Sequence, residues 1–214
     1  MHKSNTSPTF AKHAADTPTF WDLRYQAAFT PWSQSNIPLC WQQFLDAREP
    51  SNGATVLVPG CAEGFEIADL VHRGYFTTAI DFSAAAIEAA KTVLGAVAKT
   101  PNCNLRQADF FDAAFTHAPF DLVYERAFLC ALPPKLWPNY AEQMAAIIKP
   151  GGLLAGFFCY DPVPPIPKGP PFGLDQNVLE ALFLGRFERI SIATPTDSVA
   201  VFAGREQFEV WQRR

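Results

Sequence analysis

The sequence predicts an α/β fold in which a doubly wound, mostly parallel sheet of seven strands carries an antiparallel hairpin at one edge. Short apolar, β-branched runs alternate with segments whose apolar residues recur at helical spacing, which is typical of a parallel sheet covered on both faces. The last two runs lack a helix between them, so we expect them to pair as the hairpin. Such an arrangement is Rossmann-like.

The order of the elements follows from the same patterns. Strands are expected over residues 55–58, 76–80, 104–107, 120–124, 153–159, 187–193 and 208–212. Helices are expected over residues 39–45, 63–73, 134–149 and 177–184, and Ser83 should N-cap an alanine-rich helix. Pro150-Gly151-Gly152 should end the helix before it and separate it from the next strand. The proline-rich loop over residues 161–172 is too long for a simple connection, so we expect it to act as a lid.

Bulk composition sets the class of protein. A chain of 214 residues with 49% hydrophobic and 18% charged residues can form a packed core, and we expect a flexible tail over residues 1–17 and one domain over 18–214 that starts with a helical cap. The net charge of -4 gives no electrostatic case for binding nucleic acid or an anionic membrane. No run resembles a signal peptide or a membrane span. We therefore expect a cytoplasmic monomer with a small-molecule partner.

The five cysteines are odd in number, widely spaced and free of any CxxC pair. This pattern is typical of reduced thiols in a cytosol rather than of a disulfide framework or a zinc site. Cys61 and Cys130 lie within motifs, and we expect both to be buried rather than nucleophilic. No metal site is predicted.

A glycine turn follows the first predicted strand, in the run VLVPGCAEG over residues 56–64. Such a turn lets backbone N–H groups approach a ligand closely. Asp81 lies twenty-one residues beyond Gly60, at the tip of the second predicted strand, where a carboxylate can accept both hydroxyls of an adenosine ribose. The alternative is a loop glycine with a solvated aspartate. Because both residues fall where a site at the strand ends requires them, we favour an adenosine site.

The spacing of the glycines separates two adenosine cofactors. The dinucleotide pattern GxGxxG would place glycine at 60, 62 and 65, whereas the chain has Gly60, Ala62 and Phe65. The GxGxG pattern of S-adenosylmethionine-dependent methyltransferases would place it at 60, 62 and 64, and Gly60 and Gly64 satisfy two of these three positions. The pattern therefore favours S-adenosylmethionine over NAD.

Two further pairs follow predicted strands. Asp109 and Phe110 come after the third strand and could hold the adenine amino group and stack on its ring, or form an ordinary turn with the phenylalanine in the core. Glu125 and Arg126 end the fourth strand, where a ligand crevice is expected, although such a pair can also be a surface or capping pair. The position at the strand end favours a functional pair.

Several motifs occur together in one order: FWDLRY, TPW, VLVPGCAEG, AIDFS, ADFFD, FDLVYERAFLCALPP, IKPGG and GPPF. In this the sequence resembles the thiopurine S-methyltransferase family, which also contains thiol and halide methyltransferases of plants. The resemblance covers about residues 20–212, and it implies the class I fold of S-adenosylmethionine-dependent methyltransferases.

Site residues follow from this resemblance. It implies a cofactor site for S-adenosylmethionine, and for its product S-adenosylhomocysteine, built from Trp21, Trp32, Gly60, Gly64, Asp81, Phe82, Asp109, Phe110 and Glu125. It implies that Arg126 is the catalytic residue, close to the acceptor sulfur and favouring its thiolate. It also implies that the loop ending in Phe172 covers the acceptor, so that Arg126 and Phe172 bind the substrate.

The chain departs from the family pattern at three places. Ala62 stands where glycine is usual, Glu125 replaces the commoner aspartate, and no glycine occurs around Ala27–Phe29 before the Thr-Pro-Trp element. These departures concern cofactor affinity and acceptor shape more than the type of reaction.

The resulting hypothesis is methyl transfer from S-adenosylmethionine to a small soft nucleophile, most of all the sulfur of a thiol or a thiopurine-like heterocycle. A halide or a chalcogen oxyanion is the alternative acceptor. Two hypotheses from other classes are an NAD-linked oxidoreductase on the same sheet and a non-catalytic protein that binds S-adenosylmethionine. The missing third glycine of GxGxxG and the lack of a Tyr-x-x-x-Lys pair count against the first, and Ala62 is the feature that favours the second.

Overall fold

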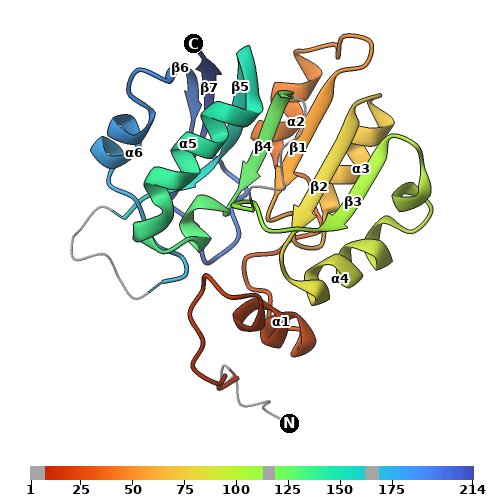
Figure 1. Cartoon of the computed structure of the whole chain (residues 1–214), viewed down its shortest axis with the longest axis vertical. Helices are drawn as coiled ribbons and strands as arrows, with labels where there is room; N and C mark the ends of the chain where they lie inside the picture. The colour runs from red at the N-terminus through yellow and green to blue at the C-terminus, as the bar shows by residue number, and fades with distance from the viewer. Residues whose placement is uncertain (1–7, 113–118, 162–168) are drawn as a thin grey trace.

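A computed structural model describes residues 8–112, 119–161 and 169–214 and contains one seven-stranded sheet (Figure 1). The strand order is β3-β2-β1-β4-β5-β7-β6. Neighbouring strands from β3 to β5 are parallel, and β7 is antiparallel to both β5 and β6. The strands are β1 (Thr55–Pro59), β2 (Phe76–Asp81), β3 (Cys103–Gln107), β4 (Phe120–Arg126), β5 (Ile148–Cys159), β6 (Phe187–Ala193) and β7 (Glu206–Arg213). The predicted fold class, with its antiparallel edge hairpin, is confirmed.

Helices cover both faces of this sheet. The α-helices of the described residues are α1 (Pro18–Gln26), α2 (Leu39–Asp46), α3 (Phe65–His72), α4 (Ala84–Leu94), α5 (Trp137–Ile147) and α6 (Gln176–Phe183). Short 3-10 helices lie at Val97–Lys99, Leu129–Ala131 and Pro134–Leu136. Within the same residues, no helix is long and apolar enough to cross a membrane.

Alternate residues of each strand enter two different cores, because successive side chains of a strand point to opposite faces. Val56, Val58 and Tyr124 pack with α2, α3 and α4 on one face. Leu57 and Val123, their neighbours along the chain, pack with α5 and α6 on the other. The central strands therefore consist almost wholly of buried apolar residues, which is the pattern that predicted a doubly covered sheet.

Two local differences from the sequence prediction concern glycines. α3 begins at Phe65 rather than at residue 63, because Gly64 has a φ of +70° and is not helical. α5 ends at Ile147 and β5 starts at Ile148 rather than at residue 153, so Pro150-Gly151-Gly152 lies inside β5 and neither ends the helix nor separates it from the strand. Ile148 pairs with Phe120, and the register then shifts before Leu122 pairs with Leu153. The left-handed Gly151, with a φ of +77°, lets the strand continue through this irregularity.

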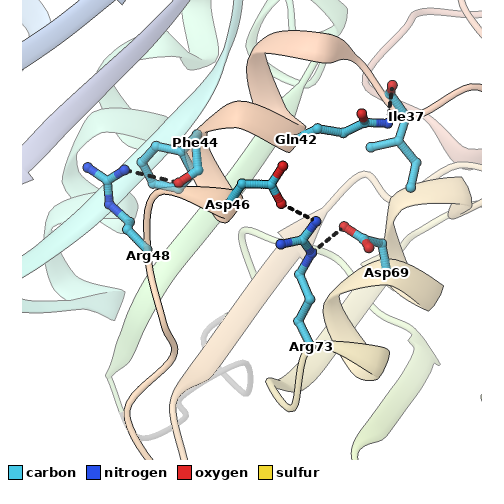
Figure 2. Close-up of polar contacts among 7 residues, drawn as sticks. All are labelled: Ile37, Gln42, Phe44, Asp46, Arg48, Asp69 and Arg73. Atoms are coloured by element: carbon cyan, nitrogen blue, oxygen red, sulfur yellow. Dashed lines mark hydrogen bonds and ion pairs between the residues drawn. The ribbon is translucent and has the colours of Figure 1, made fainter.

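Ion pairs connect α2 to α3 near the amino ends of the central strands (Figure 2). The Arg73 guanidinium lies 2.7 Å from the Asp46 carboxylate of α2 and 2.9 Å from the Asp69 carboxylate of α3. Arg48 donates to the carbonyl of Phe44 and its guanidinium lies 4.0 Å from that ring. Such partly exposed ion pairs contribute at most about 1 kcal/mol each, so the buried apolar face of α2 holds it in place.

The chain before the sheet forms a cap over the carboxyl ends of the strands, with α1 lying beyond the arrowheads of β2 and β4 (Figure 1). Asp22 of α1 accepts hydrogen bonds from the Ser83 hydroxyl (2.6 Å) and the Ala85 N–H (3.0 Å) at the start of α4. Contacts begin before α1: Ala15 is buried, and Asp16 forms an ion pair with Lys135. The cap is thereby joined to both sides of the strand ends.

Candidate functional site

A cavity of about 390 Å³ lies between the cap and the carboxyl ends of the strands. Its lining comes from α1 and the segment after it, from the β1–α3 turn, from the ends of β2, β3 and β4, and from residues 169–171 and 201–202. A smaller cavity of about 50 Å³ adjoins it, and the two share the residues Trp32, Gly60, Ala62, Arg126 and Ala127. Most of the predicted site residues meet around this pair of cavities.

The β1–α3 turn is built from left-handed backbone at alternate positions. Gly60, Ala62 and Gly64 have φ values of +57°, +52° and +70°. A Cβ on Gly60 would lie 2.5 Å from the Phe128 ring, so this position has no room for a side chain. Ala62 adopts the conformation that glycine favours, at a cost of about 1–2 kcal/mol. The turn therefore keeps the GxGxG backbone although its middle residue is alanine.

At a second departure from the family pattern, an alanine again adopts a left-handed backbone conformation. Ala28, where the segment before Thr30 lacks the usual glycine, has a φ of +50°. Both alanines thus occupy left-handed positions, and the backbone geometry is retained with some strain.

Asp81 connects the glycine turn to the end of β2. Its carboxylate accepts the N–H of Ala62 (3.2 Å) through one oxygen and the N–H of Ser83 (2.9 Å) through the other. Burial raises the pKa of Asp81 to about 6, although these two N–H groups favour the ionised form. Asp81 and the adjacent Phe82 both line the larger cavity.

Aromatic side chains of the cap form one wall of the larger cavity. The rings of Trp21 and Trp32 meet edge to face, with centroids 5.4 Å apart, and Tyr25 packs on Trp32 at 6.0 Å. The Trp21 indole N–H donates to the carbonyl of Ala15 (2.8 Å). Both predicted tryptophans therefore face the cavity, although their sequence positions alone would also suit core residues.

The end of β3 forms both a turn and part of the cavity wall. Asp109 and Phe110 line the larger cavity. Asp109 also closes a turn by accepting the N–H of Phe111 (2.9 Å). Phe110 is only 4% exposed and packs edge to face on Phe128, so it belongs to the core as well as to the cavity wall.

Arg126 and Glu125, predicted as a pair, are separated by the alternation of β4. Arg126 lines both cavities, whereas Glu125 lines neither. The Glu125 carboxylate is fully buried and accepts the N–H groups of Phe128 (2.7 Å) and Leu129 (3.0 Å), and burial raises its pKa to about 7. Because neighbouring strand residues point to opposite faces, Glu125 holds the turn after β4 and does not face the cavity.

Glu66 is the partner of Arg126 and was not predicted from the sequence. Its carboxylate accepts from the Arg126 guanidinium (2.9 Å) and from the Tyr124 hydroxyl (3.1 Å), and it is 9% exposed. Burial disfavours the Arg126 cation, but Tyr124 and Glu66 outweigh this and raise its pKa. The signal available in the sequence was an acidic residue in the first turn of a helix that starts beside the glycine turn.

Beside Arg126 the larger cavity is apolar. Cys130, Cys159 and Phe202 form a small cluster on which Trp32, Ala127 and Val201 pack. All of these except Cys159 line the larger cavity. We call Ala127, Cys130, Val201 and Phe202 the apolar end of the cavity. Nothing in the sequence motifs indicated Val201 or Phe202, which lie between the last two strands.

The proline-rich loop is described only at its ends, because residues 162–168 lie outside the described residues. Gly169, Pro170 and Pro171 line the larger cavity, whereas the predicted Phe172 does not. The N–H of Phe172 donates to the carbonyl of Cys130 (2.6 Å), and its ring packs against the core beneath α5 and α6. Phe172 therefore anchors the end of the loop beside the cavity.

Comparison with known proteins identifies the family to which these features belong. The family model described as thiopurine S-methyltransferase matches residues 16–214. The chain belongs to this family. It is 26% identical over 197 residues to thiocyanate methyltransferase 1 of Brassica oleracea, which covers 90% of this chain and 84% of that protein. It is also 26% identical over 209 residues to the thiopurine S-methyltransferase of Aliivibrio fischeri, which covers 90% of this chain and 96% of that protein.

Solved structures confirm the fold of this family member. The magnesium protoporphyrin IX methyltransferase of Synechocystis with bound S-adenosylmethionine superposes with a TM-score of 0.68, at 15% identity, over 96% of this chain and 100% of that chain. A structure described for the conversion of a disulfide bond into a thioacetal group during echinomycin biosynthesis gives a TM-score of 0.73, at 18% identity, over 92% and 93%.

The protein is an S-adenosylmethionine-dependent methyltransferase, and the dinucleotide considered as an alternative is not its cofactor. The cavity fits S-adenosylmethionine in one respect: the buried Asp81 carboxylate lines it beside the glycine turn, where a ribose can bind.

Proposed function

We propose that this enzyme methylates the sulfur of a small thiol or thiopurine-like heterocycle. The observation that carries the proposal is the position of Arg126, which lines both cavities and lies between the glycine turn and the apolar end. An acceptor bound at the apolar end would have a fixed cation beside its nucleophilic atom. A halide or a chalcogen oxyanion is the second candidate, because one relative is named thiocyanate methyltransferase and the pocket chemistry suits soft anions in general.

The cofactor site would be formed by residues of the cap and the first three strands. Asp81 would accept the ribose hydroxyls, and Asp109 and Phe110 would contact the adenine. Trp21, Trp32 and Phe82 would enclose the nucleoside, and Gly60 would allow close approach of the backbone. Each of these residues lines the larger cavity. We assign Glu125 to the support of the turn after β4 instead, because its carboxylate already accepts two backbone N–H groups.

The chemistry that S-adenosylmethionine supplies when bound is an electrophilic methyl group on a positively charged sulfur. The protein has to position the acceptor, exclude water and keep the acceptor ionised. Arg126 is always charged and can lower the pKa of a nearby thiol without removing its proton. We propose that the acceptor enters as the anion, held beside the Arg126 cation.

The decisive experiment is a methyl-transfer assay over aromatic thiols, aliphatic thiols, iodide, thiocyanate and a tellurium or selenium oxyanion. Products are identified by mass spectrometry, and kcat/KM is compared between acceptors. We expect the highest kcat/KM for a thiol and a large loss with Arg126→Ala. A preference for iodide or an oxyanion by more than about tenfold would replace the thiol proposal with the second candidate. Unchanged activity of Arg126→Ala on the best acceptor would remove Arg126 from the acceptor site.

We also propose that the protein is a cytoplasmic monomer with no nucleic-acid partner. The five cysteines are all free and four of them are buried, as expected of a protein from a reducing compartment. The net charge of -4 disfavours binding to nucleic acid. Light scattering of the purified protein would test the monomer.

A further inference from the structure

Two cysteines lie together at the apolar end of the cavity, and the roles assigned above do not use their thiols. Cys130 lines the larger cavity, whereas Cys159, the last residue of β5, does not. Both side chains are buried and form one cluster with Phe202. The wall of the proposed acceptor half therefore contains a pair of thiols, one of which a small molecule in the cavity can reach.

The backbone holds the two cysteines next to one another through a neighbouring segment. The N–H of Phe172 donates to the carbonyl of Cys130 (2.6 Å), and the N–H of Leu174 donates to the carbonyl of Cys159 (2.8 Å). Phe172 and Leu174 are only two residues apart, so these hydrogen bonds bring both cysteines to one short stretch of chain. Residues held in this way can come close enough for a disulfide, which requires neighbouring Cα atoms.

The two thiols, which are reduced in this structure, also hydrogen-bond to each other. This hydrogen bond raises the pKa of Cys130 well above its ordinary value and lowers the pKa of Cys159, to which the Arg205 guanidinium also contributes. Because the two groups titrate together, the pair loses its first proton as a unit, and either sulfur can carry the negative charge. A thiolate beside a thiol is reactive toward disulfides.

We propose that Cys130 and Cys159 form a redox-sensitive dithiol that closes to a disulfide when a small organic disulfide, R–S–S–R, enters the apolar end of the cavity. The Cys130 thiolate attacks one sulfur of R–S–S–R, so a mixed disulfide forms and one RS⁻ leaves. The Cys159 thiolate then attacks the Cys130 sulfur and releases the second RS⁻. The two cysteines are oxidised by two electrons, R–S–S–R is reduced, and the two cysteine protons pass to the two released thiols.

The disulfide would change the acceptor half of the site. Cys130 belongs to the 3-10 helix Leu129–Ala131, and its thiol donates to the carbonyl of Ala127 (3.4 Å), the residue after Arg126. A sulfur–sulfur bond of about 2.05 Å to Cys159 removes this hydrogen bond and displaces the cavity wall. Because the acceptor of the proposed function is a thiol, whose oxidised form is R–S–S–R, methyl transfer would slow when that thiol becomes oxidised. This last consequence rests on the proposed function.

The test uses hydroxyethyl disulfide as the small disulfide and Cys40→Ser as the background, because Cys40 is the one cysteine of the five that is not buried. Mass spectrometry of the intact protein and of its peptides identifies the products. The background protein should lose two hydrogens, form a disulfide between Cys130 and Cys159, and carry no adduct. Adding Cys159→Ser should trap the mixed disulfide on Cys130, and adding Cys130→Ser should prevent both products.

Cys103→Ser, at the start of β3 and outside the lining of both cavities, is the matched control and should form the disulfide as the background protein does. Melting temperatures report whether the variants fold. A stable adduct on the background protein, a disulfide that involves another cysteine, or no reaction at Cys130 would overturn the proposal.

Activity and cofactor binding test where the disulfide acts. Oxidation should lower the initial rate of methyl transfer to an aliphatic thiol by about tenfold or more, and dithiothreitol should restore it. Affinity for S-adenosylhomocysteine, measured by calorimetry, should change by less than about twofold, because the proposed cofactor contacts lie elsewhere in the cavity. An oxidised protein with an unchanged initial rate would overturn the control of the acceptor half. If the reduced protein methylates no thiol, the proposed function fails, whereas the masses still decide whether the dithiol exists.

Discussion

The two halves of the site are built in different ways. The centre of the proposed cofactor half, at the ends of β1 and β2, is a short stretch of chain from residue 60 to residue 83 in which backbone N–H groups donate to Asp81. Side chains of the cap and of the end of β3 complete this half. The proposed acceptor half is lined by Arg126, Cys130, Pro170 and Phe202, which come from distant parts of the sequence. It depends on side-chain contacts such as the Glu66–Arg126 ion pair.

This difference predicts that substitutions are easier to accommodate in the acceptor half than in the glycine turn. The turn at the centre of the cofactor half should tolerate few changes, because its left-handed backbone and the bridging Asp81 carboxylate set the geometry. An acceptor half made of side chains from separate segments can change shape by single substitutions.

The largest expected effect is in the acceptor half. Arg126→Ala should lower kcat at neutral pH by about 10²–10³-fold, because the acceptor thiol is then mostly protonated and loses its fixed position beside the methyl group. Affinity for S-adenosylhomocysteine should change by less than about tenfold, because one long-range charge is lost and the nucleoside contacts remain. Steady-state methyl-transfer assays measure kcat, and calorimetry measures affinity for S-adenosylhomocysteine. Equal losses of kcat and of affinity would show that Arg126 contributes to both halves of the site.

The next effect is in the cofactor half. Asp81→Ala should weaken S-adenosylhomocysteine about 100-fold, because two charge-assisted hydrogen bonds to the ribose are lost and the N–H groups of Ala62 and Ser83 lose their acceptor. Asp81→Asn keeps the size of the side chain and one acceptor oxygen, so it should lose less affinity for S-adenosylhomocysteine than Asp81→Ala. Calorimetry provides the affinities, and wild-type affinity in Asp81→Ala would exclude Asp81 from the ribose site.

The pH dependence of binding tests the same carboxylate without mutation. Burial raises the pKa of Asp81 to about 6, so the group is protonated at lower pH and loses its capacity to accept two hydroxyls. Affinity for S-adenosylhomocysteine should be constant above about pH 7 and fall up to about tenfold per pH unit below pH 6, as expected for one linked proton. An affinity that is flat from pH 5 to pH 8 would contradict this role.

Titration of Asp81 should change folding stability in the direction opposite to its effect on affinity: affinity rises with pH, whereas stability falls. Because the folded protein binds the Asp81 proton more tightly than the unfolded chain does, this group lowers the free energy of unfolding as the pH rises from 3.8 to about 6. The pKa of Glu125 is raised to about 7, so this group likewise lowers the free energy of unfolding as the pH rises from 4.5 to about 7. Thermal melting of Asp81→Asn, in which the first group cannot titrate, isolates its contribution.

A smaller effect should come from Glu66, which positions Arg126 and does not contact the acceptor. Glu66→Gln keeps a hydrogen-bond acceptor for Arg126 but removes the neighbouring negative charge, so the acceptor thiol should ionise at lower pH. We expect the pH profile of kcat/KM to move down by about half a unit or more, and kcat at high pH to fall about threefold through looser positioning. A profile that does not move would show that Glu66 acts only on structure.

The smallest effect concerns the strained alanines. Ala62→Gly and Ala28→Gly should each raise the free energy of unfolding by about 0.5 kcal/mol, because relief of the left-handed strain exceeds the added entropy of the unfolded chain. Only Ala62→Gly lies in the turn, so only it should also strengthen S-adenosylhomocysteine, about twofold or more. Equal affinity gains in both variants would show that the effect is general stability rather than turn geometry.

Local chemistry made much of the molecule predictable from its sequence. The doubly buried strands, the Ser83 N-cap and the glycine turn depend on residues close together in the chain, and each appears in the structure where the patterns place it. The start of β5 at Ile148 was not predictable, because a Pro-Gly-Gly run can be kept in a strand only when a neighbour such as Phe120 pairs with it.

What the sequence by itself determined is the class of fold, the adenosine-type turn with Asp81, and the resemblance to one methyltransferase family. Only the tertiary structure decided which side chains meet. It turned Glu125 away from the cavity, set Glu66 against Arg126, and brought Cys130 and Cys159 into one cluster. The physical reason is that strand alternation and long-range packing orient a side chain, and neither can be read from the residue and its immediate neighbours.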